Sequence, residues 1–221
     1  MSGMCDSSVN KIPKTKIICI SGYSGSGKTT MMRLMQKYLP DSYYITKDEE
    51  MTRIQNPKEL ENIYGITVNT DNVIDYFREV AVSITNTANA YTDIATDKKY
   101  LELIAIYFEE KYNERFTEIL SNKAPQFIIL EWISIPQFKI WKKADYRIMV
   151  KPAKWELLAE NLEKRENRIP VTPEITKARY LSNKEIIESA EDITHEIINN
   201  YDDEYEQAIR NLCNEIVSKS Y

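Results

Sequence analysis

A short segment near the N-terminus combines glycines, a lysine and a hydroxyl residue at a spacing that binds phosphate. Gly22, Gly27, Lys28 and Thr29 fit the pattern Gly-x4-Gly-Lys-[Ser/Thr]. Glycines allow a positive φ and a close approach of the backbone, so that its N–H groups can surround phosphate oxygens. The lysine of such a loop reaches the β- and γ-phosphates, and the hydroxyl after it ligates Mg²⁺. The spacing therefore predicts that ATP binds at residues 22–30, with Mg²⁺ on Thr29.

The surroundings of these residues match the context that the motif requires. The chain has only 5 glycines, and Gly22, Gly25 and Gly27 all lie in this loop. An apolar strand is predicted before the loop, and a helix is predicted from about Lys28, where its N-terminal dipole would favour an anion. A chance glycine turn is the weaker interpretation. The residues predicted to bind the nucleotide here are Gly22, Tyr23, Ser24, Gly25, Ser26, Gly27, Lys28, Thr29 and Thr30.

A carboxylate follows the second predicted strand. Asp48 comes shortly after the strand expected at 43–46, twenty residues beyond Lys28. We expect it across the cleft from the γ-phosphate, where a carboxylate can accept a proton from an acceptor hydroxyl or orient that hydroxyl for in-line attack. Glu49 is the alternative base. Because Glu49 and Glu50 follow, a solvated acidic turn is the other interpretation.

A second carboxylate ends the most apolar strand of the chain. Residues 127–130 form a continuous apolar run, typical of a strand buried on both faces, and Glu131 follows it. A carboxylate at that point can hold Mg²⁺ through water. The alternative is a partly buried glutamate paired with Lys28, which would also lie at the site.

Two arginines flank a break in the helical pattern. Arg165 and Arg168 lie in the segment 165–173, where the periodicity is lost. On a loop that closes over the phosphates, they would stabilise the negative charge of the transition state. An ordinary charged helix end is the alternative.

The single histidine and the tryptophans are assigned mainly to packing. His195 lies on a predicted strand far along the chain from the phosphate loop, so we interpret it as structural. Trp132 follows Glu131 directly and could face an acceptor pocket, whereas Trp141 and Trp155 are expected to pack.

The elements that position these residues alternate between strands and helices. Such alternation predicts an α/β fold with a parallel sheet covered on both faces, which binds ligands at the carboxyl ends of its strands. The expected domains are a disordered leader (1–14) and a single domain (15–221), with a helical acceptor-side insert at about 49–122 and a lid at about 165–175. We expect five strands, ending near 20, 46, 131, 150 and 198, and helices at about 28–39, 56–64, 71–85, 97–121, 154–164, 173–189 and 203–217.

Composition limits the function classes. The chain has 221 residues, an apolar fraction of 43% and a net charge of −5, with a pI of about 5.2, so a dedicated nucleic-acid surface is not expected. No apolar run reaches the roughly 18 residues of a membrane span, and residues 1–15 do not resemble a secretory signal. The cysteines (Cys5, Cys19, Cys213) are scattered, with Cys19 expected in the core. We therefore expect a cytoplasmic protein without disulfides.

The loop and the elements after it resemble a known group of enzymes. Residues 20–30 look like the loop of small-molecule P-loop kinases of the nucleoside and nucleotide kinase group. The downstream half is similar to dephospho-coenzyme A kinases, in the helix and acidic-ended strand of 107–131 and in the strand and lid of 144–165. Residues 196–200 resemble their fifth strand, after which the chain contacts adenine, and this implies Asn199 as a nucleotide-binding residue. The resemblance implies a three-layer α/β/α P-loop NTPase fold of the nucleoside-monophosphate-kinase type, with a five-stranded parallel sheet and a helical lid.

The resemblance leaves the acceptor open. The loop Gly-Tyr-Ser-Gly-Ser-Gly-Lys-Thr is closer to uridine kinases than to the Gly-Gly-Ile-Gly-Ser-Gly-Lys-Ser of dephospho-coenzyme A kinases. Glu131-Trp stands where the latter have Asp, and residues 45–48 resemble the uridine-kinase strand that ends in its catalytic Asp. The expected acceptor is therefore dephospho-coenzyme A or, alternatively, uridine, cytidine or a deoxynucleoside.

Three rival classes of nucleotide-binding protein fit the sequence less well. A GTPase would need Asp-x-x-Gly after a strand, which this chain lacks. A motor or transporter ATPase would need more chain and further motifs. A nucleotide-binding regulatory protein would keep the loop but would need neither Asp48 nor the two arginines. The sequence thus favours an ATP- and Mg²⁺-dependent kinase with Lys28, Asp48, Arg165 and Arg168 as catalytic residues and with Thr29 and Glu131 as metal ligands.

Overall fold

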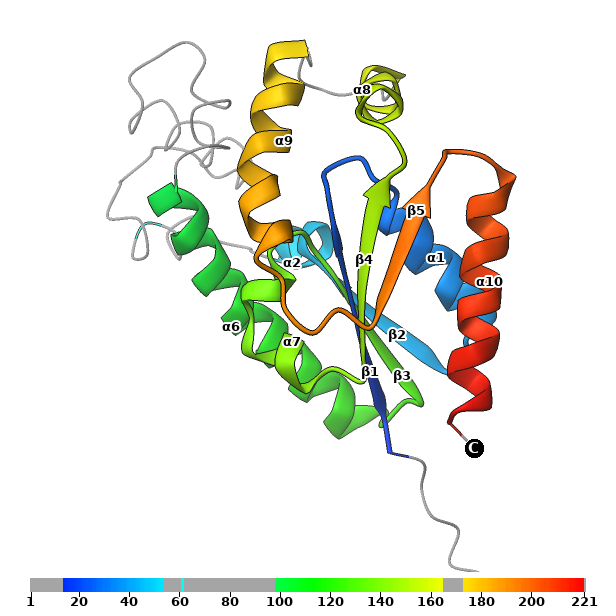
Figure 1. The fold of residues 1–221 in the computed structure, drawn as a ribbon. Helices are drawn as coiled ribbons and strands as arrows, with labels where there is room; N and C mark the ends of the chain where they lie inside the picture. The colour runs from blue at the N-terminus through cyan, green and yellow to red at the C-terminus, as the bar shows by residue number, and fades with distance from the viewer. Residues whose placement is uncertain (1–13, 54–60, 62–97, 165–172, 221) are drawn as a thin grey trace, which may run out of the picture.

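Five parallel strands form the centre of the fold in the computed structural model, which describes residues 14–53, 61, 98–164 and 173–220. The strands are β1 (Lys16–Gly22), β2 (Ser42–Thr46), β3 (Phe127–Glu131), β4 (Tyr146–Pro152) and β5 (His195–Asn199). Their spatial order is β2-β3-β1-β4-β5, and every neighbouring pair is parallel (Figure 1). The predicted five-stranded parallel sheet is confirmed, and the strand that leads into the loop lies at its centre.

Helices cover both faces of this sheet. On one face, α1 (Lys28–Tyr38) packs against α10 (Asp203–Ser218), and α6 (Lys98–Asn122) and α7 (Lys139–Lys143) cover the other face (Figure 1). This is the expected three-layer α/β/α arrangement. The remaining described helices are α2 (Lys47–Arg53), the 3-10 helix η1 (Ile135–Gln137), α8 (Trp155–Lys164) and α9 (Pro173–Glu188).

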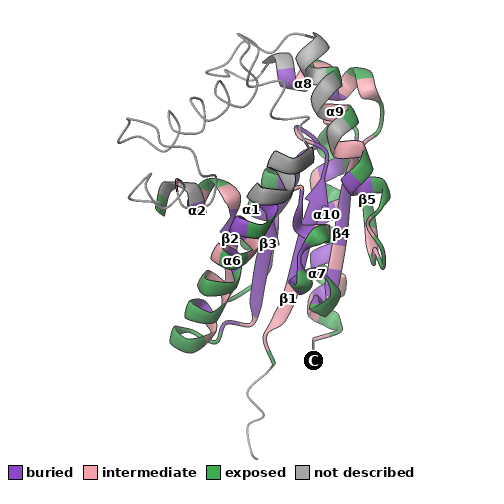
Figure 2. Cartoon of the chain, turned by 90° about the vertical axis from the view of Figure 1, so that its left-hand side faces the viewer, coloured by how far each residue is buried: buried purple, intermediate pink, exposed green. Residues whose placement is uncertain are grey.

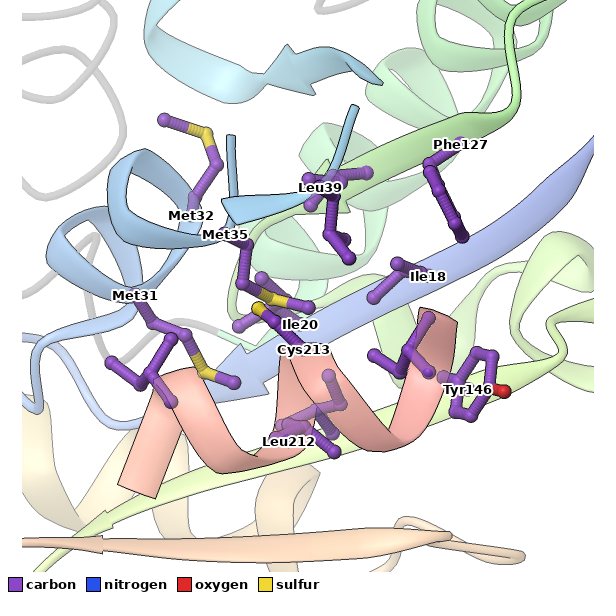
Figure 3. Close-up of a cluster of buried hydrophobic side chains, with 14 of the residues drawn as sticks. Ile18, Ile20, Met31, Met32, Met35, Leu39, Phe127, Tyr146, Leu212 and Cys213 are labelled. Carbon is purple, nitrogen blue, oxygen red and sulfur yellow. The ribbon is translucent and has the colours of Figure 1, made fainter. Parts of the chain in front are cut away.

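The central strand is buried on both sides. Successive side chains of a strand point to opposite faces, and helices cover both faces of this sheet. Ile18 and Ile20 join the cluster beneath α1 and α10, together with Met31 and Met35 (Figure 3). Cys19 points to the opposite cluster, beneath α6. Its predicted place in the core is confirmed, and burial raises the pKa of its thiol. Figure 2 shows the same burial along the strands of the sheet.

A helix replaces the acidic turn that we considered after the second strand. β2 ends at Thr46, and α2 begins directly at Lys47. The hydroxyl of Thr46 accepts a hydrogen bond from the Glu49 backbone N–H at 3.2 Å, which caps the helix. The sequence Thr-x-x-Glu is the capping-box pattern, and acidic residues in a first helical turn suit the dipole. Asp48 therefore stands on a helix and not in a loop.

The other predicted elements are found with small shifts. The expected strand at 193–198 is β5 at His195–Asn199, since the chain still turns at Asp192, whose φ is 57°. The connection after β3 consists of η1 and α7. The C-terminal helix begins where expected, because the Asp202 carboxylate accepts from the Glu204 N–H at 3.1 Å.

Several predicted segments lie outside the described residues. They are the leader up to residue 13, the two helices expected at 56–64 and 71–85 apart from Glu61, and residues 165–172 of the expected lid. In the part of the chain that the structure describes, no helix combines the length and the apolar character needed to cross a membrane.

Candidate active site

Glycines shape the loop between β1 and α1 at two points. At Gly22 (φ 149°), a Cβ atom would lie 2.1 Å from the carbonyl oxygen of Val150 on β4. At Gly27 (φ 101°), which caps α1, a Cβ atom would lie 2.4 Å from Nδ2 of Asn199. Both positions require glycine, because other residues rarely adopt these φ angles and because a side chain would collide with the neighbouring atoms. The chain thus turns from the central strand directly into a helix N-terminus, an arrangement that binds anions.

The Lys28 side chain folds back over the loop. It is buried, and its Nζ donates to the carbonyl oxygen of Tyr23 at 2.9 Å. An ammonium group is therefore held beside the N-terminus of α1, and both attract the same anion. This geometry suits the predicted contact of Lys28 with the β- and γ-phosphates.

A buried hydroxyl in the loop fits a phosphate ligand. Ser26 is fully buried, and within the described residues its Oγ has no hydrogen-bond partner. A buried hydroxyl without a partner costs free energy, so its presence calls for an explanation. A phosphate oxygen bound in the loop would accept its hydrogen bond. Ser24 is half-buried and Thr30 is exposed, so both lie at the surface of the loop.

Thr29 and Glu131 meet at the carboxyl ends of the central strands. The hydroxyl of Thr29 donates to Oε2 of Glu131 at 3.3 Å. Glu131 is buried, and its backbone carbonyl accepts from the hydroxyl of Tyr112 at 2.9 Å, which fixes the end of β3. One hydroxyl and one carboxylate are hard oxygen ligands, which suit Mg²⁺ that also keeps waters and phosphate oxygens. The described residues contain no group of three or more His, Cys, Asp or Glu side chains able to hold a metal by themselves.

Asp48 stands at the same edge of the sheet. Thr46 on β2 pairs with Glu131 on β3, and Asp48 follows two residues later in the first turn of α2, with an exposed side chain. Burial raises the pKa of Tyr112 most, and the charges of Glu131 and Asp48 raise it further. Both carboxylates therefore lie within electrostatic range of this phenol, although they are far apart in the sequence.

Glu50 is a buried carboxylate that the sequence reasoning did not single out. In the first turn of α2 the helical period turns Asp48 to solvent and Glu50 inward. Burial raises the pKa of Glu50, while Arg53 and Arg115 oppose this shift. Its Oε1 is 3.5 Å from Nε of Arg53. The capping-box pattern at Thr46 was the signal that would have identified this helix and its inward face.

Asn199 lies behind the loop. Its Nδ2 donates to the carbonyl oxygen of Ser26 at 2.8 Å, and its Oδ1 accepts from the backbone N–H of Tyr201 at 2.7 Å. The side chain is buried, with 3% of its surface exposed. The structure shows that Asn199 holds the loop, and its predicted contact with the nucleotide stays a prediction.

The remaining predicted residues are placed as follows. Arg165 and Arg168 lie outside the described residues. Trp132 is half-buried and packs against the rings of Phe108 and Phe138, so its predicted contact with an acceptor stays a prediction. The packing roles of the other aromatic and imidazole side chains are borne out by contacts of Trp141 with Glu191, Trp155 with Tyr180, and His195 with Thr194 and Tyr146.

An open hollow of about 690 Å³ lies beside the edge strand β2, and no residue of the phosphate loop lines it. Its cationic side chains are Lys37, Arg53 and Arg115. Each of them already pairs with a carboxylate, from Glu206, Glu50 and Glu118 respectively. Glu49, the alternative catalytic carboxylate, also lines the hollow, so the hollow lies on the acceptor side of the candidate site and away from the phosphate loop.

The similarities of this chain to known proteins lie in its three-dimensional structure. No family model matches the sequence, and no curated protein matches it. TT1252 from Thermus thermophilus is 16% identical with a TM-score of 0.64, over 93% of this chain and 97% of that one. Shikimate kinase from Bacteroides thetaiotaomicron (12%, TM-score 0.54) matches over 92% and 98% of the two chains. Thymidylate kinase from Candida albicans (14%, TM-score 0.53) matches over 93% and 92%.

These similarities confirm the expected three-layer α/β/α fold with a five-stranded parallel sheet. Each of them extends over nearly the whole of both chains, so the match is not limited to the phosphate loop and its flanking strand and helix. At these identities the likeness concerns the architecture, and the activity is argued from the site.

Proposed function

We propose that the protein is an ATP-dependent phosphotransferase that moves the γ-phosphate to a hydroxyl of a small nucleotide-like acceptor. The observation that carries this proposal is the meeting of the loop and two strand ends. Lys28, Thr29 and Glu131 lie together, and Asp48 stands in the first turn of α2, directly after the neighbouring strand β2. A nucleotide-binding protein without turnover would need only the loop.

Each side chain has a role in this proposal. Lys28 binds the β- and γ-phosphates and stabilises charge on the transferring group. Thr29 and Glu131 would hold Mg²⁺, which neutralises phosphate charge when bound. Asp48 orients or deprotonates the acceptor hydroxyl. Arg165, supported by Arg168, adds positive charge over the phosphates.

The acceptor proposed first is the ribose 3′-hydroxyl of dephospho-coenzyme A, and the alternative is a nucleoside 5′-hydroxyl. The first rests on the resemblance of the downstream half of the chain, and the alternative rests on the loop and on the segment that ends in Asp48. The names of two structural neighbours add shikimate and thymidylate as acceptors to test.

The test is to incubate the purified protein with Mg-ATP and one acceptor at a time, and to follow ADP release. The panel holds dephospho-coenzyme A, uridine, cytidine, deoxynucleosides, thymidylate, other nucleoside monophosphates and shikimate. Mass spectrometry of the product locates the new phosphate. Lys28→Ala protein, handled identically, controls for a contaminating kinase.

A strong response to dephospho-coenzyme A or to a nucleoside, lost in Lys28→Ala, would support both the reaction and the acceptor. A response only to shikimate or to a nucleoside monophosphate would support phosphoryl transfer but overturn the proposed acceptor. Binding of ATP without transfer to any acceptor would overturn the proposal in favour of a nucleotide-binding regulatory protein. Failure to bind ATP at all would reject both the phosphotransferase and the regulatory protein.

A further inference from the structure

Three successive carbonyl groups of the phosphate loop are held by side chains from outside the loop. The carbonyl oxygen of Gly25 accepts from Nδ2 of Asn161 on α8 at 3.0 Å and from the hydroxyl of Tyr201 at 3.1 Å. The carbonyl oxygen of Ser26 accepts from Asn199, at the end of β5, as described above. That of Gly27 accepts from the hydroxyl of Tyr205 on α10 at 3.1 Å. We call these four side chains the loop clamp: Asn161, Asn199, Tyr201 and Tyr205.

None of the four side chains of the loop clamp is exposed. Asn199 and Tyr205 are buried, and Asn161 and Tyr201 are half-buried. Its members come from α8, from α10 and from the end of β5 and the turn after it, so separate parts of the chain converge on one short stretch of backbone. Convergence of this kind fixes the orientation of each peptide group more firmly than one contact would.

The direction of the held carbonyls decides where the N–H groups point. In a trans peptide the C=O group and the N–H group that follows it point in opposite directions. Because the carbonyls of Ser26 and Gly27 point toward the clamp, the N–H groups of Gly27 and Lys28 point away from it. Backbone N–H groups aligned in this way form an anion-binding nest.

We propose that the loop clamp consists of positioning residues that hold the phosphate loop in its phosphate-binding conformation before the nucleotide arrives. This inference rests on the proposed function, since it assumes that phosphate binds on the side of the loop away from the clamp. A pre-organised site avoids the cost of ordering the backbone on binding. The clamp therefore sets the affinity of the loop for phosphate without touching the nucleotide phosphates.

The test uses isosteric changes that remove one hydroxyl each. Tyr205→Phe and Tyr201→Phe each remove one hydrogen bond to the loop and keep the ring. The matched control is Tyr38→Phe, because the Tyr38 hydroxyl joins α1 to Glu206 and Arg210 of α10, away from the loop. Binding of MgADP and of adenosine is measured by titration, and the free energy of unfolding is measured in urea.

We expect each clamp variant to bind MgADP about fivefold more weakly, the value of one typical hydrogen bond, with adenosine binding unchanged. Adenosine carries no phosphate, so a change confined to MgADP locates the effect at the loop. The double change Tyr201→Phe with Asn161→Leu removes both donors to Gly25 without adding charge and should weaken MgADP binding further. Tyr38→Phe should bind both ligands as the wild type does.

The outcomes separate this inference from the proposed function. If the wild type binds MgADP and the folded clamp variants bind it equally well, the loop clamp is structural only and the inference is wrong. The inference is also wrong if binding of MgADP and binding of adenosine weaken together. If the wild type does not bind MgADP, the proposed function itself is rejected. Tyr201 is half-buried, so its variant keeps the test open should Tyr205→Phe not fold.

Discussion

The hydroxyl of Thr29 lies 3.3 Å from the Glu131 carboxylate and joins the first turn of α1 to the end of β3. These residues are 102 positions apart in the sequence, and they meet because β1 and β3 are neighbours in the sheet. The pair places a hydroxyl and a carboxylate beside the loop, which is the arrangement expected for a Mg²⁺ site that phosphates complete.

Replacing the carboxylate of this pair should change the metal dependence of the reaction. Glu131→Gln keeps the shape of the side chain but removes its charge. We expect the Mg²⁺ concentration needed for half-maximal ADP release to rise by on the order of tenfold, because an outer carboxylate commonly contributes that much to metal affinity. A Mg²⁺ titration of ADP release in both proteins measures the shift, and an unchanged midpoint would remove Glu131 from the metal site.

Removing the ammonium of Lys28 should abolish phosphoryl transfer. In Lys28→Ala the loop keeps its glycines but loses the cation that we propose reaches the β- and γ-phosphates. The control is Lys37→Ala, on the same helix, where the side chain is 64% exposed and pairs with Glu206 at the surface. ADP release at the wild-type rate in Lys28→Ala would contradict its role.

Asp48→Asn should reduce turnover by on the order of 100-fold or more, while ATP binding stays as in the wild type, because a positioned general base contributes rate and not nucleotide affinity. Glu49→Gln is the matched control one residue along α2. Rates of acceptor-dependent ADP release and ATP titrations measure both effects. If Glu49→Gln lost the activity and Asp48→Asn kept it, the catalytic carboxylate would be Glu49.

The raised pKa of Glu50 makes its contribution to stability dependent on pH. Burial favours the protonated form in the folded protein, so folding takes up a proton between the unfolded and the folded pKa. The stability that Glu50 contributes is present below its unfolded pKa of about 4.3 and is lost as the pH rises through the folded pKa. The amide side chain in Glu50→Gln cannot ionise, so this variant should not lose stability in this way as the pH rises.

Urea unfolding of the wild type and of Glu50→Gln between about pH 4 and pH 7 isolates this effect, because all other groups are common to both proteins. We expect the difference in unfolding free energy to move in favour of Glu50→Gln as the pH rises. A difference that does not change with pH would mean that Glu50 has the same pKa in both states.

The parts of the fold that local patterns determine could be predicted from the sequence. The phosphate loop, the apolar strands and the alternation of strands with helices depend on spacing along the chain, and the structure has them. Thr46-x-x-Glu49 also marks the helix at Asp48 locally, but our sequence analysis interprets these residues as a catalytic carboxylate or an acidic turn and not as the start of a helix.

Contacts that depend on the packing of distant segments could not be predicted in this way. Asn161 and Gly25 are 136 positions apart, and Tyr205 and Gly27 are 178 positions apart. Nothing in the sequence around Asn161 or Tyr205 distinguishes a side chain that binds the loop from an ordinary polar residue. The same reasoning applies to Asn199: its strand follows from the local pattern, but its hydrogen bond to the Ser26 carbonyl does not.

The space around Gly22 has a consequence for how this motif would change over time. The Val150 carbonyl of β4 occupies the place that any side chain at position 22 would need. Selection for folding therefore preserves this glycine even in a descendant that no longer handles nucleotides. Thr29, by contrast, is exposed at the start of α1 and is free to drift once its hydroxyl is not used. Among descendants of this chain, loss of Thr29 with retention of Gly22 would mark the lineages in which the proposed metal contact of Thr29 was no longer used.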